Sequence, residues 1–348
     1  MSSKERICRT KVICTIGPSS ENEDILRELL KEGLDGARFN FSYGTHQEHL
    51  ARIQTLRKIE KELGLTIPCI LDTKGSEIRI GKYTEPVELK EGQKFTLTIN
   101  EVLGDINTAT ISYKDIVKGL KKESKVLIND GFIELKVDDI TDTDIICTVI
   151  RGGVIDSNKN VNLPGTVISL PFLAQKDLDD IKFGVENGFD FIATSFTRTQ
   201  QDCLTIKNYL KELNAEHIKI IAKIENQEGL NNFNKILPLV DGIIVARGDL
   251  GAELSLQEVP LKQKIMLKKC CKSGKIGIIS NQMLISMTKN PRPTRAEVTD
   301  ISNAIFDGSS AIMFSDETTI GNYLVESLRF MKNITLEAEK NMNLTELS

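Results

Sequence analysis

The chain has 348 residues, of which 40% are hydrophobic and 27% are charged, with a formal net charge of −4. This length is enough for about two domains with a sizeable core, and the slightly acidic balance without a long basic block excludes a nucleic-acid-binding footprint. The N-terminus lacks the apolar core of a signal peptide, no apolar run approaches a membrane span, and the seven cysteines contain no CxxC pair, so we expect a cytoplasmic protein with reduced thiols and no membrane partner.

Short β-branched segments alternate with helical patterns along most of the chain. They lie at 11–16, 36–42 and 68–74 and, after a gap, at 190–196, 219–225, 241–248, 275–280 and 309–315. Near-continuously apolar strands that alternate with helices are typical of a parallel sheet. Eight such units favour an α/β fold of the (β/α)₈ TIM barrel type, and a doubly wound open sheet is the alternative.

Residues 76–172 interrupt this alternation. They contain short segments of alternating polar and apolar residues at 94–99, 108–113, 125–130, 132–139 and 144–150. Such segments are typical of antiparallel strands with one buried face. We therefore expect a small β-barrel-like lid domain at 76–172, inserted after the third barrel strand, and a barrel domain built from 1–75 and 173–348.

Polar residues follow the predicted barrel strands at their carboxyl ends, where barrel enzymes carry their active sites. They are Arg38, Asn40, Asp72, Lys74, Lys223, Glu225, Arg247, Asp249, Asn281, Asp316 and Glu317. A structural salt bridge explains any single pair of these charges equally well, but polar residues at six strand ends, with charges of both signs among them, indicate a functional site.

The segment IIAKIENQEG places Lys223 and Glu225 two residues apart at the end of an apolar strand. Side chains at this spacing point to the same side, so we expect the two to lie next to each other. Glu225 and Asp249 follow neighbouring strands, and two carboxylates with room for water and phosphate suit Mg²⁺. Lys223 beside them would stabilise an anionic intermediate, whereas Gly248 is explained either by anion binding at a helix start or by a simple turn.

Other motifs point away from several common chemistries. The chain has no GxxxxGK[ST] loop and no strand-linked GxGxxG, so a nucleotide would be held by charge and metal. His46 and His49 have the spacing of two metal ligands on a helix, but no third ligand is evident, and we expect both on the exposed helix face. Cys270 and Cys271 are expected to pack in the core.

Eight blocks of the sequence carry a resemblance to a known family when taken in chain order. They are TKVICTIGPSS, ARFNFSYGTH, LDTKGSEIRIG, VNLPG, AKIENQEG, DGIIVARGDLGAE, NQMLISMTKNPRPTRAEVTD and DGSSAIMFSDET. Together they resemble the pyruvate kinase family over essentially the whole chain. The resemblance implies a TIM barrel with a β-rich lid, and the glycolytic transfer of a phosphoryl group from phosphoenolpyruvate to ADP, which gives pyruvate and ATP. It also implies Mg²⁺ (or Mn²⁺) and K⁺ as cofactors.

The resemblance assigns a role to each matching position. Lys223 matches the lysine that stabilises the transferring phosphoryl group and the enolate, and Arg38 matches the phosphate-binding arginine. The backbone at Gly248 and Asp249 matches the site of the phosphoenolpyruvate carboxylate, and Glu225 and Asp249 match the divalent-metal ligands. The implied K⁺ ligands are Asn40, Ser42, Asp72 and Thr73. The implied nucleotide contacts are Asn40, Tyr43, Arg79 and Lys159.

Some positions depart from the family pattern. Asn281 replaces a threonine that binds the substrate carboxylate and is implicated in protonating the enolate. An amide can donate a hydrogen bond but has no hydroxyl to relay a proton, so we expect substrate binding with slower turnover. Tyr43 replaces a histidine, and Asp316 replaces a glycine and adds a negative charge near anionic substrates.

The sequence ends at Ser348, where the family continues into a C-terminal domain with effector sites, and we expect no control through that domain. A homo-oligomer through the barrel stays compatible with the sequence.

Three functions are compatible with the barrel and its strand-end residues. An active pyruvate kinase without C-domain control is favoured because the charged residues and the K⁺ ligands are retained. A catalytically impaired paralogue that binds phosphoenolpyruvate and metal as a regulatory or binding protein is the alternative. A metal-dependent aldolase or lyase is disfavoured by VNLPG, Lys159 and the K⁺ ligands.

Overall fold

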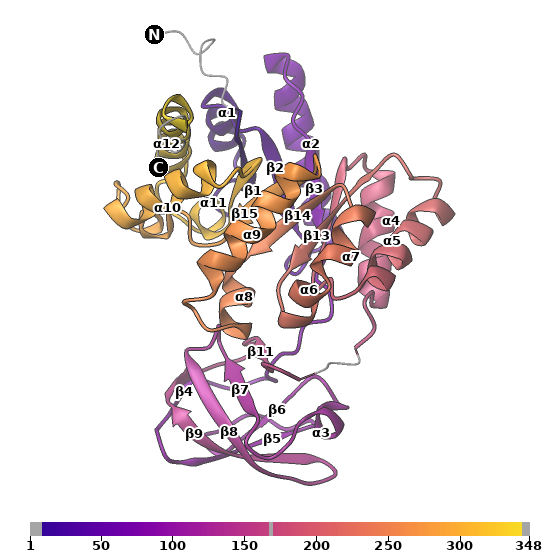
Figure 1. The fold of residues 1–348 in the computed structure, drawn as a ribbon, viewed down its shortest axis with the longest axis vertical. Coiled ribbons are helices and arrows are strands. Elements are labelled where there is room, and N and C mark those ends of the chain that lie inside the picture. The colour runs from indigo at the N-terminus through magenta and orange to yellow at the C-terminus, as the bar shows by residue number, and fades with distance from the viewer. Residues whose placement is uncertain (1–8, 167–169, 343–348) are drawn as a thin grey trace.

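The computed structural model describes residues 9–166 and 170–342. Within these residues, the predicted parallel strands form one closed barrel in the order β1-β16-β15-β14-β13-β12-β3-β2 (Figure 1). Their bounds are β1 (Lys11–Thr15), β2 (Gly36–Asn40), β3 (Cys69–Asp72), β12 (Phe191–Thr194), β13 (Lys219–Ile224), β14 (Gly242–Ala246), β15 (Ile276–Ser280) and β16 (Ala311–Phe314). Since β1 pairs with both β2 and β16, the sheet has no edge, which confirms the barrel and excludes the open sheet.

Apolar side chains pack on both faces of the barrel wall. Along β1, Ile13 belongs to the cluster inside the barrel, whereas Val12 and Cys14 belong to the larger cluster between strands and helices. Burial of an aliphatic side chain stabilises the fold by roughly 1.5–3 kcal/mol. This double burial explains why the strands are nearly continuous apolar runs in the sequence.

Helices connect successive strands of the barrel. The longer ones are α1 (Glu23–Lys31), α2 (His46–Leu63), α4 (Gln175–Glu186), α5 (Gln200–Glu212), α9 (Val259–Lys272), α10 (Arg295–Phe306) and α12 (Leu324–Lys340). The shorter ones are α6 (Gln227–Asn231), α7 (Phe233–Ile236), η2 (Leu237–Leu239), α8 (Arg247–Glu253), η3 (Ile285–Thr288) and α11 (Asp316–Thr319). The start of α2 is set by a capping box between Thr45 and Glu48, and Gly64 ends it in the left-handed conformation.

A second, smaller unit lies between β3 and α4 and projects from one end of the barrel (Figure 1). It contains β4 (Val87–Leu89), β5 (Lys94–Thr98), β6 (Thr108–Thr110), α3 (Ile116–Gly119), β7 (Lys125–Ile128), β8 (Ile133–Ile140), β9 (Asp144–Arg151), β10 (Gly153–Ile155) and β11 (Val161–Asn162). One sheet has the order β11-β7-β8-β9-β5-β6, and β10 pairs with β4. The segments predicted as strands correspond to β5 to β9, whereas β4, β10 and β11 are too short to give a clear pattern.

Buried apolar residues between Ile78 and Leu163 form a cluster separate from those of the barrel. On this basis we propose residues 76–172 as the lid domain, and 1–75 with 173–348 as the barrel domain.

Among the described residues, no helix combines the length and the apolarity needed to cross a bilayer.

Candidate active site

A cavity of about 670 Å³ opens at the carboxyl end of the barrel. Its wall includes Arg38, Lys223 and Asp249 from the barrel, together with Glu77 and Asp130 from the lid. A smaller cavity of about 250 Å³ shares Glu77 and Asp249 with the larger one. Most of the strand-end residues predicted from the sequence therefore surround one space that faces the lid; the exceptions are Asp72, Lys74, Arg247 and Glu317.

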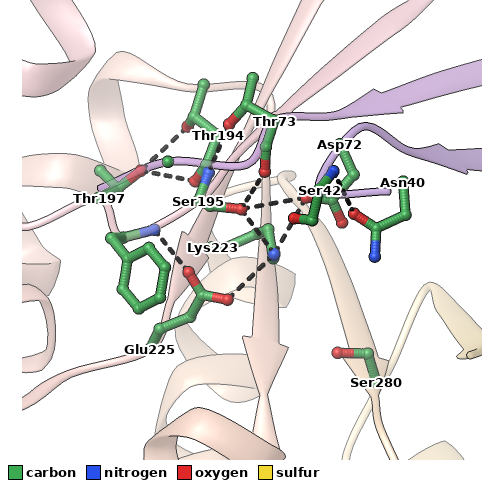
Figure 2. Close-up of polar contacts among 12 residues, drawn as sticks. Asn40, Ser42, Asp72, Thr73, Thr194, Ser195, Thr197, Lys223, Glu225 and Ser280 are labelled. Atoms are coloured by element: carbon green, nitrogen blue, oxygen red, sulfur yellow. Dashed lines mark hydrogen bonds and ion pairs between the residues drawn. The ribbon is translucent and has the colours of Figure 1, made fainter. Parts of the chain in front are cut away.

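Lys223 is a buried cation held by three acceptors (Figure 2). Its Nζ lies 3.0 Å from Asp72 Oδ1, 3.0 Å from Glu225 Oε1 and 2.8 Å from Ser195 Oγ. Burial alone would lower the pKa of Lys223, but the two carboxylates outweigh burial and raise it. The pair that the sequence placed on one side of the strand is thus in direct contact, and Lys223 stays charged at neutral pH.

Asp72 has 0% exposure and pairs with two cations. Besides Lys223, its carboxylate accepts a hydrogen bond from Arg38 Nε at 2.6 Å. Arg38 also donates from Nη1 to Thr15 Oγ1 at 2.9 Å, which fixes the guanidinium at the end of β2. Burial acts to raise the pKa of Asp72, but Arg38 and Lys223 lower it overall.

Glu225 and Asp249 bring two carboxylates to the same part of the cavity. They follow the paired strands β13 and β14, and Glu225 accepts a hydrogen bond from the Phe196 backbone N–H. Burial raises the pKa of Asp249 well above its usual value, and the negative charge of Glu225 raises it further.

A divalent cation would relieve this repulsion, so the donor set fits a metal bound by two carboxylates with water or substrate oxygens. Among the residues that the structure describes, no group of three or more His, Cys, Asp or Glu side chains could hold a metal ion.

A second group of oxygen atoms lies where β2 and β3 end. Asn40 and Asp72 are paired in register, and Asn40 Oδ1 accepts a hydrogen bond from Ser42 N–H at 3.0 Å. The Thr73 carbonyl accepts one from Ser195 Oγ at 2.6 Å. Figure 2 shows Asn40, Ser42, Asp72 and Thr73 close together above Lys223. This amide, hydroxyl, carboxylate and carbonyl set has the hard oxygen donors that alkali and alkaline-earth cations prefer.

Asn281 occupies a backbone position with φ of +73°, in the left-handed region. Its Oδ1 accepts a hydrogen bond from Ser280 Oγ at 3.0 Å, and a Cβ built on Gly248 would lie 3.4 Å from its amide nitrogen. Arg247 holds the same turn because its Nη2 donates to the Asn281 carbonyl at 2.6 Å, while Nη1 pairs with Asp300. Asparagine is one of the few residues that adopt this conformation readily, so Asn281 suits the turn that presents it to the cavity.

The lid contributes a second set of charges to the cavity. Arg79 pairs with Glu77 through Nε at 2.7 Å and donates from Nη1 to the Asn158 carbonyl at 2.7 Å. Tyr43, from the barrel, is 65% exposed and lines the same cavity.

Four of the site residues named from the sequence do not line this cavity, namely Asp72, Thr73, Lys159 and Gly248, although Asp249, next to Gly248, does. The Lys159 carbonyl accepts a hydrogen bond from Ile80 N–H at 2.8 Å within the lid.

A family model described as the barrel domain of pyruvate kinase matches residues 7–328. The chain belongs to the pyruvate kinase family. Curated pyruvate kinases of Geobacillus stearothermophilus and Clostridium acetobutylicum are 46% and 45% identical to it over 335 and 337 residues. These matches cover 95% and 96% of this chain, but 57% and 71% of the two relatives. The chain therefore spans little more than half the length of the first of these pyruvate kinases.

Two residues of the site were not singled out from the sequence. Ser195 follows β12 and contacts Lys223, and its place at a strand end is the signal that could have identified it. Asp130 lies in a lid turn where Asn129, Asp130 and Gly131 all have positive φ, and it faces the cavity. The sequence signals a turn there, but not that the turn faces the barrel.

The exposed position expected for His49 is wrong. Its ring is 2% exposed, stacks on Phe41 at 4.1 Å between centroids and donates from Nε2 to the Tyr43 carbonyl at 2.9 Å. Helix α2 turns this face toward aromatic residues at the end of β2, which a helical pattern alone does not reveal. His46 contacts Asp180 instead. Of the two cysteines, Cys270 is buried as expected, whereas Cys271 is exposed.

Proposed function

We propose that this chain transfers a phosphoryl group from phosphoenolpyruvate to ADP, giving pyruvate and ATP, with Mg²⁺ (or Mn²⁺) and K⁺. The observation that carries the proposal is the position of Lys223, a buried cation between Asp72 and Glu225 in a cavity that also contains Arg38. A fixed cation in a water-poor site stabilises developing negative charge far better than one in water. The enolate and the transferring phosphoryl group both carry such charge.

In this proposal, Arg38 and Lys223 bind the phosphate of phosphoenolpyruvate. Both are already oriented by Asp72, so little reorganisation is needed when the substrate arrives. The backbone at Gly248 and Asp249 would bind the substrate carboxylate, and Asn281 would donate its amide to the same group. Asn281 has no hydroxyl for a proton relay, so we propose that protonation of the enolate carbon is slower than in relatives with threonine.

Glu225 and Asp249 would hold Mg²⁺ or Mn²⁺, and Asn40, Ser42, Asp72 and Thr73 would hold K⁺. When bound, these cations would add positive charge beside the phosphoryl oxygens. The raised pKa of Asp249 supports the first assignment, because burial and the negative charge of Glu225 both disfavour its ionised form and a bound cation would offset them. The shared oxygen donors at the ends of β2 and β3 support the second.

The nucleotide would bind on the lid side of the cavity, near Asn40, Tyr43 and Arg79. Lys159 belongs to the lid and does not line the cavity, so its proposed phosphate contact requires the lid to bring its side chain toward the cavity. This arrangement is a proposal drawn from the family pattern, as is a homo-oligomer formed through the barrel.

No specific observation favours the impaired, phosphoenolpyruvate-binding alternative. The deciding experiment measures pyruvate formation from phosphoenolpyruvate and ADP with Mg²⁺, with and without K⁺, in the parent chain and in Lys223→Met. We expect K⁺-dependent turnover in the parent and loss of turnover in the variant. Metal-dependent phosphoenolpyruvate binding without turnover, restored by Asn281→Thr, would support the alternative instead. A parent chain that shows no turnover and no phosphoenolpyruvate binding would refute the proposal.

A further inference from the structure

Ser195 lies at the centre of the network around Lys223, and no step proposed above uses it. It directly follows β12, and it is 2% exposed. Its Oγ lies 2.8 Å from Lys223 Nζ, 2.6 Å from the Thr73 carbonyl and 3.1 Å from Asp72 Oδ1 (Figure 2). One hydroxyl thus connects the ends of three barrel strands.

This hydroxyl both accepts and donates a hydrogen bond within the network. An ammonium group has donors only, so Ser195 Oγ must accept from Lys223. Its single proton is then donated to the Thr73 carbonyl or to Asp72. The Ser195 backbone N–H donates to Thr73 Oγ1 at 3.1 Å, which ties both parts of the residue to the end of β3.

Tight packing holds Ser195 in place. Gly75 has φ of +69°, and a Cβ built on it would lie only 2.8 Å from Ser195 Cβ. The segment that leads from β3 into the lid therefore passes directly over Ser195, and a glycine is needed for both the conformation and the close approach. The hydroxyl has little room to move away from Lys223.

We propose that Ser195 is a positioning residue that aims the Lys223 ammonium at the substrate and links it to two of the proposed K⁺ ligands, Asp72 and Thr73. Lysine has a long, flexible stem, and its ammonium has three donors. Asp72, Glu225 and Ser195 occupy these donors, so the direction of the group is defined. Of the three acceptors, Ser195 is the neutral one, so removing it changes the geometry without changing the charge.

The catalytic consequence rests on the proposed function, because a misplaced ammonium slows only a reaction that needs it. A displacement of about 1 Å at a reacting centre can cost about 100-fold in rate. We expect Ser195→Ala to lower kcat by about 10–100-fold with little change in the KM for phosphoenolpyruvate. We also expect a higher K⁺ concentration for half-maximal activity, since Thr73 and Asp72 lose a shared partner.

A matched control separates positioning from the loss of any buried hydroxyl. Ser327, on α12, has 0% exposure and donates to the Tyr323 carbonyl at 2.7 Å. Ser327→Ala removes the same kind of group far from the cavity. We expect it to lower the melting temperature as Ser195→Ala does, but to leave kcat and the K⁺ dependence unchanged.

The test combines turnover with a cycle of melting temperatures that needs no turnover. Ser195→Ala, Lys223→Met and the double variant are compared, and the same cycle is measured with Ser327→Ala. Residues in one network are not additive, so the double variant with Ser195 should lose less than the sum of its single losses, whereas the Ser327 cycle should be additive.

Each result of this test has a defined meaning. Additive losses for Ser195 and Lys223 would overturn the proposal whatever the activity. Non-additive losses with a Ser195→Ala kcat equal to that of Ser327→Ala would overturn its catalytic part. A parent chain without turnover would count against the proposed function, while the melting cycle would still decide whether Ser195 positions Lys223.

Discussion

Replacing Lys223 with methionine tests the charge network directly. Methionine keeps most of the length and the apolar stem of lysine but carries no charge. In the parent, Lys223 Nζ lies 3.0 Å from both Asp72 and Glu225, whose exposures are 0% and 2%. The variant leaves Asp72 with Arg38 as its cationic partner and removes the cation that contacts Glu225.

The expected loss of stability follows from the burial of these carboxylates. Removing one partner of a buried ion pair costs about 3–5 kcal/mol, because the other charge is left buried without compensation. For a barrel of this size, about 1 kcal/mol corresponds to roughly 2–4 °C in melting temperature. We therefore expect Lys223→Met to melt roughly 6–20 °C below the parent at pH 7.

The pH dependence gives the sharper test. The pKa of Asp72 is lowered in the folded chain, so its ionised form contributes stability above its unfolded pKa, and this contribution is lost as the pH falls through the folded pKa. Lys223 provides part of that contribution. The difference in stability between parent and Lys223→Met should therefore narrow as the pH falls from 7 towards the acid unfolding range.

Thermal melting at a series of pH values measures this difference, with Lys332→Met as the control. Lys332 is a second buried lysine, 4% exposed, and it pairs with Asp35 at the opposite end of the barrel. Both variants should lose stability, but only Lys223→Met should lose pyruvate formation. A gap between parent and Lys223→Met that stays constant or widens on acidification would show that the lysine does not stabilise ionised Asp72.

Three further predictions concern Glu253 at the end of α8, the turn at Asn281 and the metal. Burial raises the pKa of Glu253 to about 6, so its protonated form stabilises the fold below its unfolded pKa, and this contribution is lost as the pH rises through 6. The free energy of unfolding of Glu253→Gln should therefore rise by about 1–2 kcal/mol relative to that of the parent between pH 4.5 and 7. A difference between the two free energies, measured by urea unfolding, that does not change with pH would contradict this. Asn281→Thr should lose about 1–2 kcal/mol of unfolding free energy, because a β-branched residue is strained at positive φ. Asn281→Gly should not show this loss. Equal melting temperatures for the parent and Asn281→Thr would argue against the strain. Mg²⁺ should raise the melting temperature of the parent, by about 2.7 kcal/mol of added stability at 100 times its dissociation constant, and Asp249→Asn should abolish the rise; an equal rise in the variant would move the metal elsewhere.

The sequence predicts the barrel well because its strands are nearly continuous apolar runs that alternate with helical patterns. It predicts the contact of Lys223 with Glu225 for a local reason, namely that residues two apart share a side of a strand. The contact of Ser195 with Lys223 joins different strands, so it depends on how the barrel closes. The burial of His49 likewise depends on how α2 packs against the barrel. Local patterns therefore identify which residues reach the mouth of the barrel, but not which of them touch.

The closure of the barrel also has a consequence for how the chain folds during synthesis. The first strand pairs with the last, with Lys11 next to Ala311 and the Thr15 hydroxyl donating to the Phe314 carbonyl. The barrel can therefore be completed only after the chain has been made as far as β16. The lid packs residues from Ile78 to Leu163 against one another, a much shorter span. Because contacts between distant residues form slowly, we expect the lid to fold before the barrel closes.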